Sequence, residues 1–232
     1  MQDDKCDMLV LPGSPAVQVR LRRSPRARRL SLRVSGVDGR VTLSLPHAVP
    51  LAAARDFLDR QADWVRGHLA DRPHPWSPRI GGVIPVGGRD LPIVVGRRAR
   101  LHSDRAELRD GSPAGPQLAA LLKAHARVRL AAACDGFAAQ IGRPYTALVL
   151  RDTRSRWGSC SSAGRLMFSW RLVMAPPEVL DYVAAHEVAH LAEMNHSRAF
   201  WIEVARLCPE YAVRRRWLRD HGAVLHGIRF AP

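Results

Sequence analysis

The sequence has few cysteines, and no two of them are close enough to form a paired metal-binding motif. Its four cysteines (Cys6, Cys134, Cys160 and Cys208) are widely scattered without C-x-x-C spacing, which argues against a cysteine zinc site and against a disulfide framework. No run of about 18 apolar residues predicts a transmembrane helix. Residues 1–7 are acidic and lack the apolar core of a secretory signal. These absences favour a reduced, cytoplasmic compartment.

Lysine is also scarce, so the positive charge comes from arginine. Lys5 and Lys123 are the only lysines among 36 basic residues, and the formal net charge is +15. Such a charge attracts nucleic acid, anionic lipid or acidic peptides through its general field. Arginine richness with few lysines often reflects genome composition, so nucleic-acid binding is the less favoured interpretation. The clusters Arg22–Arg29 and Arg214–Arg216 are interpreted as solvated basic faces.

The first half of the chain alternates between apolar and polar residues, a pattern that predicts strands. Residues 16–46 repeat the period of two, with an Asp38-Gly39 turn signal before the last predicted strand. Apolar residues at helical spacing predict a helix over 51–70. Proline and glycine are concentrated in 71–82, which predicts a linker. Short apolar runs at 83–86 and 91–95 predict a hairpin around Gly87-Gly88.

A second glycine- and proline-rich segment, residues 111–116, places the expected domain boundary between residues 112 and 113. After it, an alanine- and leucine-rich helix is predicted over 117–140, ended by Gly142. Strands follow at 145–152 and 164–173. A helix that begins at Pro176-Pro177 is predicted to run to about Met194, and further helices are expected at 197–207 and 210–221.

The segment His186-Glu187-Val188-Ala189-His190 lies in that predicted helix. Positions four apart share one helix face, so His186 and His190 aim both imidazoles at one point, which suits a single zinc ion. Glu187 is turned by about 100° from the first ligand and reaches a zinc-bound water without being a ligand. Zinc lowers the pKa of that water towards about 7, and a carboxylate takes its proton. The pattern predicts a hydrolase with Glu187 as general base.

His196, six residues after His190, is the first candidate for third ligand. The chain must turn sharply to bring it back, and Asn195 tolerates the left-handed conformation that ends helices. Ser197 then caps the next helix. Two alternatives stay open: Glu210, whose separation from His190 matches thermolysin-type sites, and the weaker candidate Glu203.

Glu193 stands where the long metzincin motif has glycine, so a true metzincin is not expected. Its carboxylate is a candidate to orient a histidine, although a solvated glutamate is an equal interpretation.

The Arg-Trp-Gly-Ser-Cys loop is the second unusual feature. Arg154 or Arg156 is expected to bind a substrate carboxylate or stabilise the oxyanion, and the edge of strand 164–171 is expected to accept an extended peptide. In the opposing interpretation, Trp157 packs in the core and both arginines pair with acidic residues such as Asp152. Cys160 is interpreted as a small buried residue without a base partner.

Four segments carry a resemblance to a known family: residues 154–161, 172–177, 186–191 and 195–201. Together they resemble the YgjP-like metallopeptidase domain family, which are bacterial zincins whose site pattern is also similar to that of SprT-type proteases. The N-terminal half matches more loosely, from Arg22 to Pro46 and over residues 61–65. The resemblance implies His186, His190 and His196 as zinc ligands and Glu187 as catalytic base.

The expected fold is α+β: a zincin-like half with helices and a small antiparallel sheet (113–232), preceded by a β-rich region with one helix (1–112). The expected function is a peptidase with one Zn²⁺ that hydrolyses peptides or proteins. Two alternatives are kept: a nucleic-acid-associated SprT-like protease, and a non-catalytic binding module stabilised by a four-ligand zinc. Membrane partners are not expected, and the sequence does not predict the oligomeric state.

Overall fold

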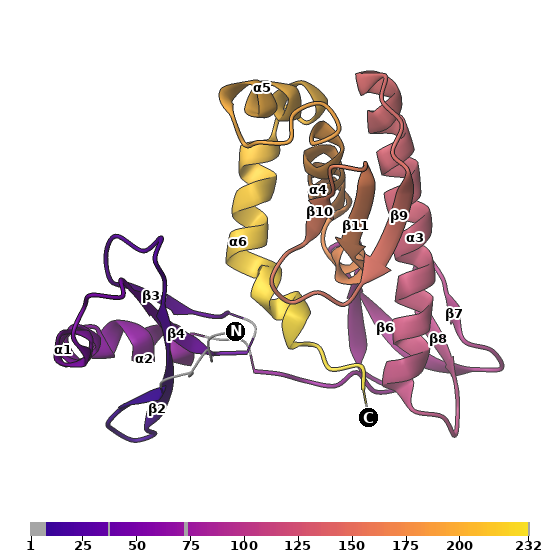
Figure 1. Ribbon diagram of the computed structural model, residues 1–232. Coiled ribbons are helices and arrows are strands. Elements are labelled where there is room, and N and C mark those ends of the chain that lie inside the picture. Colours follow the sequence, from indigo (N-terminus) through magenta and orange to yellow (C-terminus); the bar gives the residue numbers. More distant parts are fainter. Residues whose placement is uncertain (1–7, 37, 72–73, 232) are drawn as a thin grey trace. The chain divides into compact units, whose positions relative to one another are not determined.

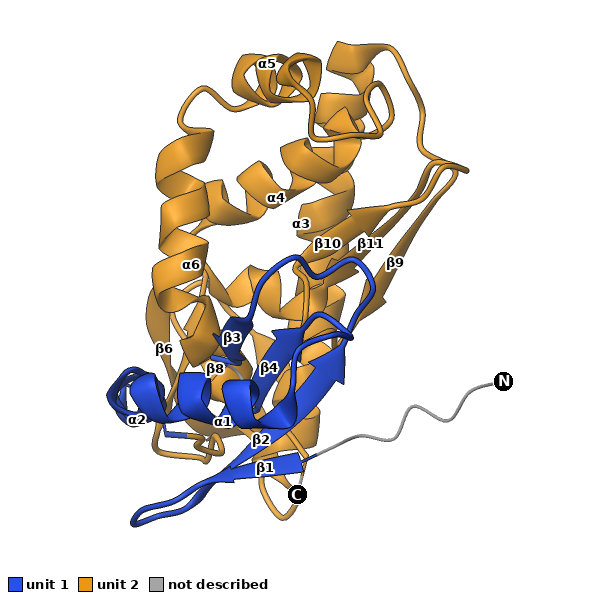
Figure 2. Ribbon diagram, turned by 60° about the vertical axis from the view of Figure 1, so that its left-hand side comes forward, with its two compact units in different colours: residues 1–74 blue, residues 75–232 orange. Residues whose placement is uncertain are grey.

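The structure, a computed structural model, describes residues 8–36, 38–71 and 74–231. The chain forms two compact units, Met1–His74 and Pro75–Pro232 (Figure 2). The division lies within the predicted 71–82 linker, whereas the expected boundary at 112/113 falls inside the second unit. The reason is packing: Leu118 and Leu122, beyond that boundary, share one core with Ile93 and Leu108 before it.

The first unit is a four-stranded sheet with two helices (Figure 1). Its strands, in spatial order, are β1 (Met8–Leu11), β2 (Val17–Arg23), β4 (Val41–Leu45) and β3 (Ser31–Val34). β2 and β4 run parallel, and the outer pairs are antiparallel. The single helix predicted over 51–70 is two helices, α1 (Leu51–Arg60) and α2 (Ala62–Ala70), with the break at Gln61.

The second unit begins with a four-stranded sheet, which contains β5 (Val83–Val86), β6 (Arg89–Gly96), β8 (Ala106–Arg109) and β7 (Arg100–Leu101) in spatial order. The predicted hairpin is confirmed, because β5 and β6 pair in antiparallel register. Its turn needs glycine for a steric reason as well as a conformational one. Gly88 has a φ of 72°, and a side chain there would lie 2.9 Å from the Pro176 ring that begins the motif-bearing helix.

A second sheet contains β10 (Gly158–Cys160), β11 (Arg165–Ser169) and β9 (Ala147–Arg151), in that spatial order. β10 pairs antiparallel with β11, but β9 pairs parallel with it. The expected antiparallel sheet is therefore mixed. The strand predicted over 164–173 is shorter than expected, because Trp170–Met174 forms the 3-10 helix η1. β11 is the central strand, so the edges of this sheet belong to β10 and β9 and not to 164–171.

Four helices complete this unit: α3 (Ala114–Ile141), α4 (Pro177–Ala189), α5 (Arg198–Leu207) and α6 (Tyr211–Gly227). α3 ends at Gly142, whose φ is 70°, as predicted. α4 packs against α3 and carries the HExxH segment. The prediction that α4 reaches Met194 was wrong, because the helix ends at Ala189. Within the described residues, no helix has the length and apolar character needed to span a membrane.

Candidate metal centre

Three histidine rings converge at the end of α4. The ligand-capable nitrogens of His186, His190 and His196 all lie within 4.8 Å of one another. Nε2 of His196 is 3.1 Å from Nε2 of His186. A tetrahedral zinc ion with Zn–N bonds of about 2.0–2.1 Å separates its nitrogen ligands by about 3.3 Å. The histidine triad therefore fits a single ion of this size and chemistry.

The early end of α4 is what brings His196 back to the triad. His190 is the C-cap residue of α4, and the chain then turns through residues 190–197. Asn195 does not use the predicted left-handed conformation, since no described residue other than glycine has a positive φ. The predicted cap is confirmed: the Ser197 hydroxyl accepts a hydrogen bond from the Phe200 amide at 3.3 Å.

Backbone and aromatic groups hold the rings in place. Nδ1 of His190 lies 3.0 Å from the backbone oxygen of Glu193, an arrangement that leaves Nε2 free to face a metal. Glu193 thus contributes its main chain to the contact. The Phe200 ring stacks on His190 with centroids 4.4 Å apart, and Trp201 stacks on His196 at 5.9 Å. The first turn of α5 therefore shields the triad.

Two rings of the triad, His186 and His190, are held in the uncharged state that a metal requires. Burial lowers the pKa of His186 to about 4, and the charges of His190 and His196 act in the same direction. Burial also lowers the pKa of His190. Both rings are neutral at pH 7, and only a neutral imidazole offers a lone pair to a metal ion.

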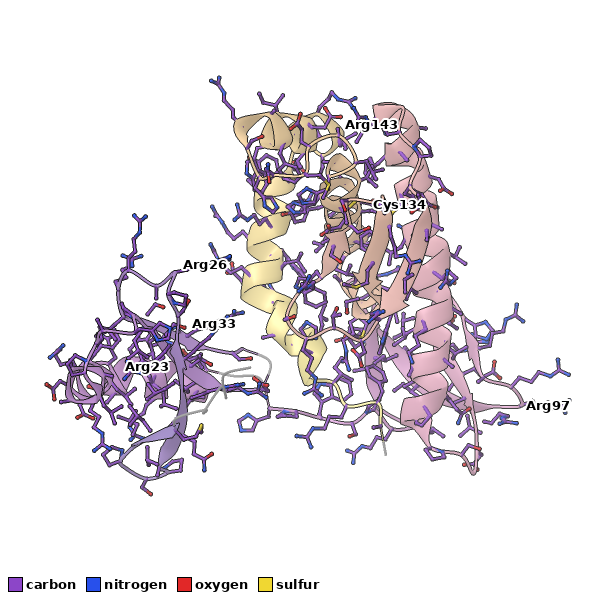
Figure 3. The ribbon with its side chains drawn as sticks, viewed as in Figure 1. Arg23, Arg26, Arg33, Arg97, Cys134 and Arg143 are labelled. Carbon is purple, nitrogen blue, oxygen red and sulfur yellow. The ribbon has the colours of Figure 1, made fainter. Side chains whose placement is uncertain are left out.

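Glu187 is buried beside the triad, and burial raises the pKa of its carboxyl to about 8 against the opposing charge of Arg156. Its carboxyl group lies against Gly158 of β10, where an ideal Cβ would be 2.5 Å from Oε1. The Cys134 (Figure 3) and Cys160 thiols have pKa values raised to about 12 and about 11, by burial first and by the Glu187 charge in addition. Both thiols stay protonated at neutral pH, so neither is an activated nucleophile.

The two carboxylates weighed as third ligands have other partners. Glu210 forms an ion pair with Arg214, four residues later on α6. Glu203 forms one with Arg206 at 2.5 Å on α5. Among the described residues, the group that can hold a metal contains three histidines and no carboxylate. The structure therefore brings His196, and neither glutamate, to His186 and His190.

A cavity of about 350 Å³ opens beside Glu187 and His186. Its wall consists of Arg156, Trp157, Gly158, Tyr182, Val183, His186, Glu187, Arg215, Leu218 and Arg219. Arg156 lines this cavity, whereas Arg154 is not among the lining residues. Trp157 is half-buried and stacks on His226 of α6 at 4.3 Å.

The opposing interpretation named Asp152 as a partner of Arg154 and Arg156, but Asp152 pairs with Arg171 of η1, with Nε 2.6 Å from Oδ1. Arg171 is buried and also donates to the backbone oxygens of Leu225 and Ile228, both at 2.8 Å. It ties the end of β9 to the end of α6.

Three residues of the cavity wall were missed by the sequence interpretation: Tyr182, Arg215 and Arg219. Arg215 had been assigned to a solvated face, but its guanidinium lies 5.1 Å from the centre of the Trp201 ring. The helical spacing of each residue could have placed it on the same face as a site residue. Tyr182 precedes His186 by one turn, and Arg215 and Arg219 are one turn apart on α6.

Comparison with known proteins identifies a family for this chain. The YgjP-like metallopeptidase domain model matches residues 28–221. No curated protein matches the chain. The solved metallopeptidase zymogen of Pyrococcus abyssi abylysin is 20% identical, covering 39% of this chain and 93% of that one, with a TM-score of 0.36. The family match spans most of the sequence and includes the histidine triad and Glu187, so the chain belongs to the YgjP-like metallopeptidase domain family.

Proposed function

We propose that this metallopeptidase uses one zinc ion, held by His186, His190 and His196, with Glu187 as general base. The observation that carries the proposal is the convergence of three imidazoles within 4.8 Å of one another, beside a buried carboxylate. Three protein ligands are typical of catalytic zinc, whereas a structural zinc usually has four. The set of described ligands therefore favours an enzyme over a zinc-stabilised binding module.

A zinc ion in this position supplies positive charge that polarises an attacking water and the scissile carbonyl. Glu187 accepts the proton of that water on its carboxylate and then delivers it to the leaving amine. The raised pKa of Glu187 suits the second role, delivery of the proton to the leaving amine, because it makes the protonated carboxyl stable near neutral pH. Phe200 and Trp201 stack on His190 and His196 and so cover one side of the triad.

The substrate proposed is an extended peptide that pairs with the free edge of β10. This three-residue strand bonds to β11 on one side only, and Gly158 at its start lies against Glu187. Strand addition there places a peptide backbone beside the carboxyl group.

The arginines of the cavity wall, Arg156, Arg215 and Arg219, favour a substrate carboxylate close to the scissile bond. An acidic side chain beside the cleaved bond should therefore be preferred over its amide analogue. Replacement of Arg215 by alanine should reduce that preference without removing the bound metal.

Metal analysis of purified variants tests the ligand assignment. Wild-type protein reconstituted with zinc should hold one ion per chain, and His196→Ala should lose it. Glu210→Ala is the matched control, because Glu210 is an exposed residue paired with Arg214. If Glu210→Ala loses zinc while His196→Ala retains it, the ligand set proposed here is wrong.

A further inference from the structure

The sheet of the first unit has one face covered by helices and one face open. Val19, Leu21, Val41 and Leu43 are buried in a core with Ala54 and Leu58 of α1 and Val65 of α2. Side chains alternate across a strand, so the intervening residues point to the other side. On β2, β4 and β3 these are Gln18, Arg20, Arg22, Thr42, Ser44, Ser31 and Arg33. On the edge strand β1 they are the exposed Met8 and Val10, which lie opposite Arg20 and Gln18. We call this surface the open face.

The strand register arranges the open face in rows. Arg20 is opposite Thr42 on one side of β4, and Arg33 is opposite Thr42 on the other. The next row contains Arg22, Ser44 and Ser31. Strands are about 4.8 Å apart, so the two arginines beside Thr42 stand about 10 Å apart at Cα. Guanidinium groups therefore flank a central line of hydroxyls.

The strands of the open face carry no acidic residue, whereas the helices carry both signs of charge, with Arg55, Arg60 and Arg66 beside their aspartates. Residues 8–36 contain seven arginines and no aspartate or glutamate. Apart from Asp38, which pairs with Arg40, the described acidic residues of the unit are on α1 and α2 or at their end; they are Asp56, Asp59, Asp63 and Asp71.

The loop between β2 and β3 adds Arg26, Arg28 and Arg29, all exposed. Arg23 has a structural role, since it donates to the backbone oxygens of His47 and Val49. Arg23, Arg26 and Arg33 are labelled in Figure 3. An ordinary solvated surface mixes both signs of charge, and the open face does not.

We propose that the open face binds the phosphate backbone of a nucleic-acid duplex. Arginine, serine and threonine side chains are the usual donors to phosphate oxygens. Residues 8–45 contain no Phe, Trp or Tyr. The face therefore lacks the stacking platform of single-strand binders, and it lacks the aromatic anchors that enter a lipid interface. This activity is independent of the metal centre and goes beyond the proposed peptidase.

Fluorescence anisotropy with a short labelled DNA duplex of mixed sequence tests the proposal on the full chain. The test variant is R20A/R22A/R33A. The matched control is R97A/R98A/R100A, which removes the same charge from exposed positions of β7 and of the turn before it in the other unit. Each lost phosphate contact lowers the slope of log K against log salt by about 0.9. For the test variant, the magnitude of that slope should therefore fall by about 2.7. The variant should bind the duplex at least about tenfold more weakly than wild type in about 0.1 M salt.

The control should stay within a few-fold of wild type, and R20K/R22K/R33K should retain most binding because it keeps the charges on the same fold. Equal losses in both alanine variants would show that net charge alone attracts DNA and would overturn the assignment. So would tighter binding of a single strand than of the duplex, or binding of anionic phosphatidylglycerol vesicles without binding of DNA. Glu187→Gln should bind the duplex as wild type does, so this proposal and the peptidase proposal fail separately.

Discussion

Gly158→Ala should displace the carboxylate of Glu187 from its position while leaving the histidine triad intact. Gly158 begins β10 and has no positive φ, so alanine is compatible with its backbone. The added Cβ would lie 2.5 Å from Oε1, 2.6 Å from Cγ and 2.8 Å from Cδ of Glu187. The three nearest atoms all belong to that one side chain. The methyl group therefore acts on the proposed base and not on the ligands.

Ordinary carbon contacts begin near 3.5 Å, so the carboxyl group must move by about 1 Å. A misplacement of that size costs on the order of a hundredfold in rate. The assay is digestion of a peptide library by zinc-loaded wild type and variant, together with the zinc content of each. We expect about a hundredfold lower kcat, one zinc per chain and an unchanged circular dichroism spectrum.

Gly136→Ala is the matched control for Gly158→Ala. Gly136 lies within α3, and a Cβ there meets nothing within 4 Å. Unchanged cleavage by Gly158→Ala, with its zinc retained, would refute the reasoning, because the position of Glu187 would then not limit catalysis. Loss of zinc in Gly158→Ala would also refute it, since the contact would then extend to the triad.

Three further predictions concern stability. Gly136→Ala should stabilise the protein by about 0.5–1 kcal/mol through higher helix propensity, which raises Tm by about 1–4 °C. Arg171→Met leaves two buried carbonyls without their charged donor and should cost about 3 kcal/mol in urea unfolding. His226 is protonated in the unfolded chain before the folded one, because burial lowers its folded pKa from 6.5 to about 4. Its contribution to stability is therefore present above about pH 6.5 and is lost as pH falls towards 4, by up to about 3 kcal/mol. His226→Phe keeps a ring against Trp157 and should flatten this part of the stability profile relative to wild type; an unchanged profile would contradict the assignment.

Local patterns predicted most of the elements of this chain. The hairpin at Gly87-Gly88, the long α3 ended by Gly142 and the Ser197 cap all follow from neighbouring residues. The histidine spacing likewise predicted which rings the structure brings together. Each of these features depends on contacts within a few positions along the chain, where periodicity and capping rules apply.

Several of the errors concern contacts between distant parts of the chain. The domain boundary was misplaced because α3 packs into the core of the strands before it, which a linker composition does not reveal. The mixed sheet arises because β9 pairs with β11 across the loop that carries β10. Arg171 was missed for the same reason: its partners Asp152 and Leu225 are 19 and 54 positions away.

The central claim is that Glu187 carries the proton in a zinc-dependent peptide hydrolysis. Its most direct test compares wild type with Glu187→Gln, which keeps the size of the side chain, in one peptide-library digest with the zinc content measured on the same samples. We predict one zinc per chain in both proteins and a loss of cleavage of about 10²–10⁴-fold in the variant. Undiminished cleavage by Glu187→Gln with its zinc bound would contradict the mechanism.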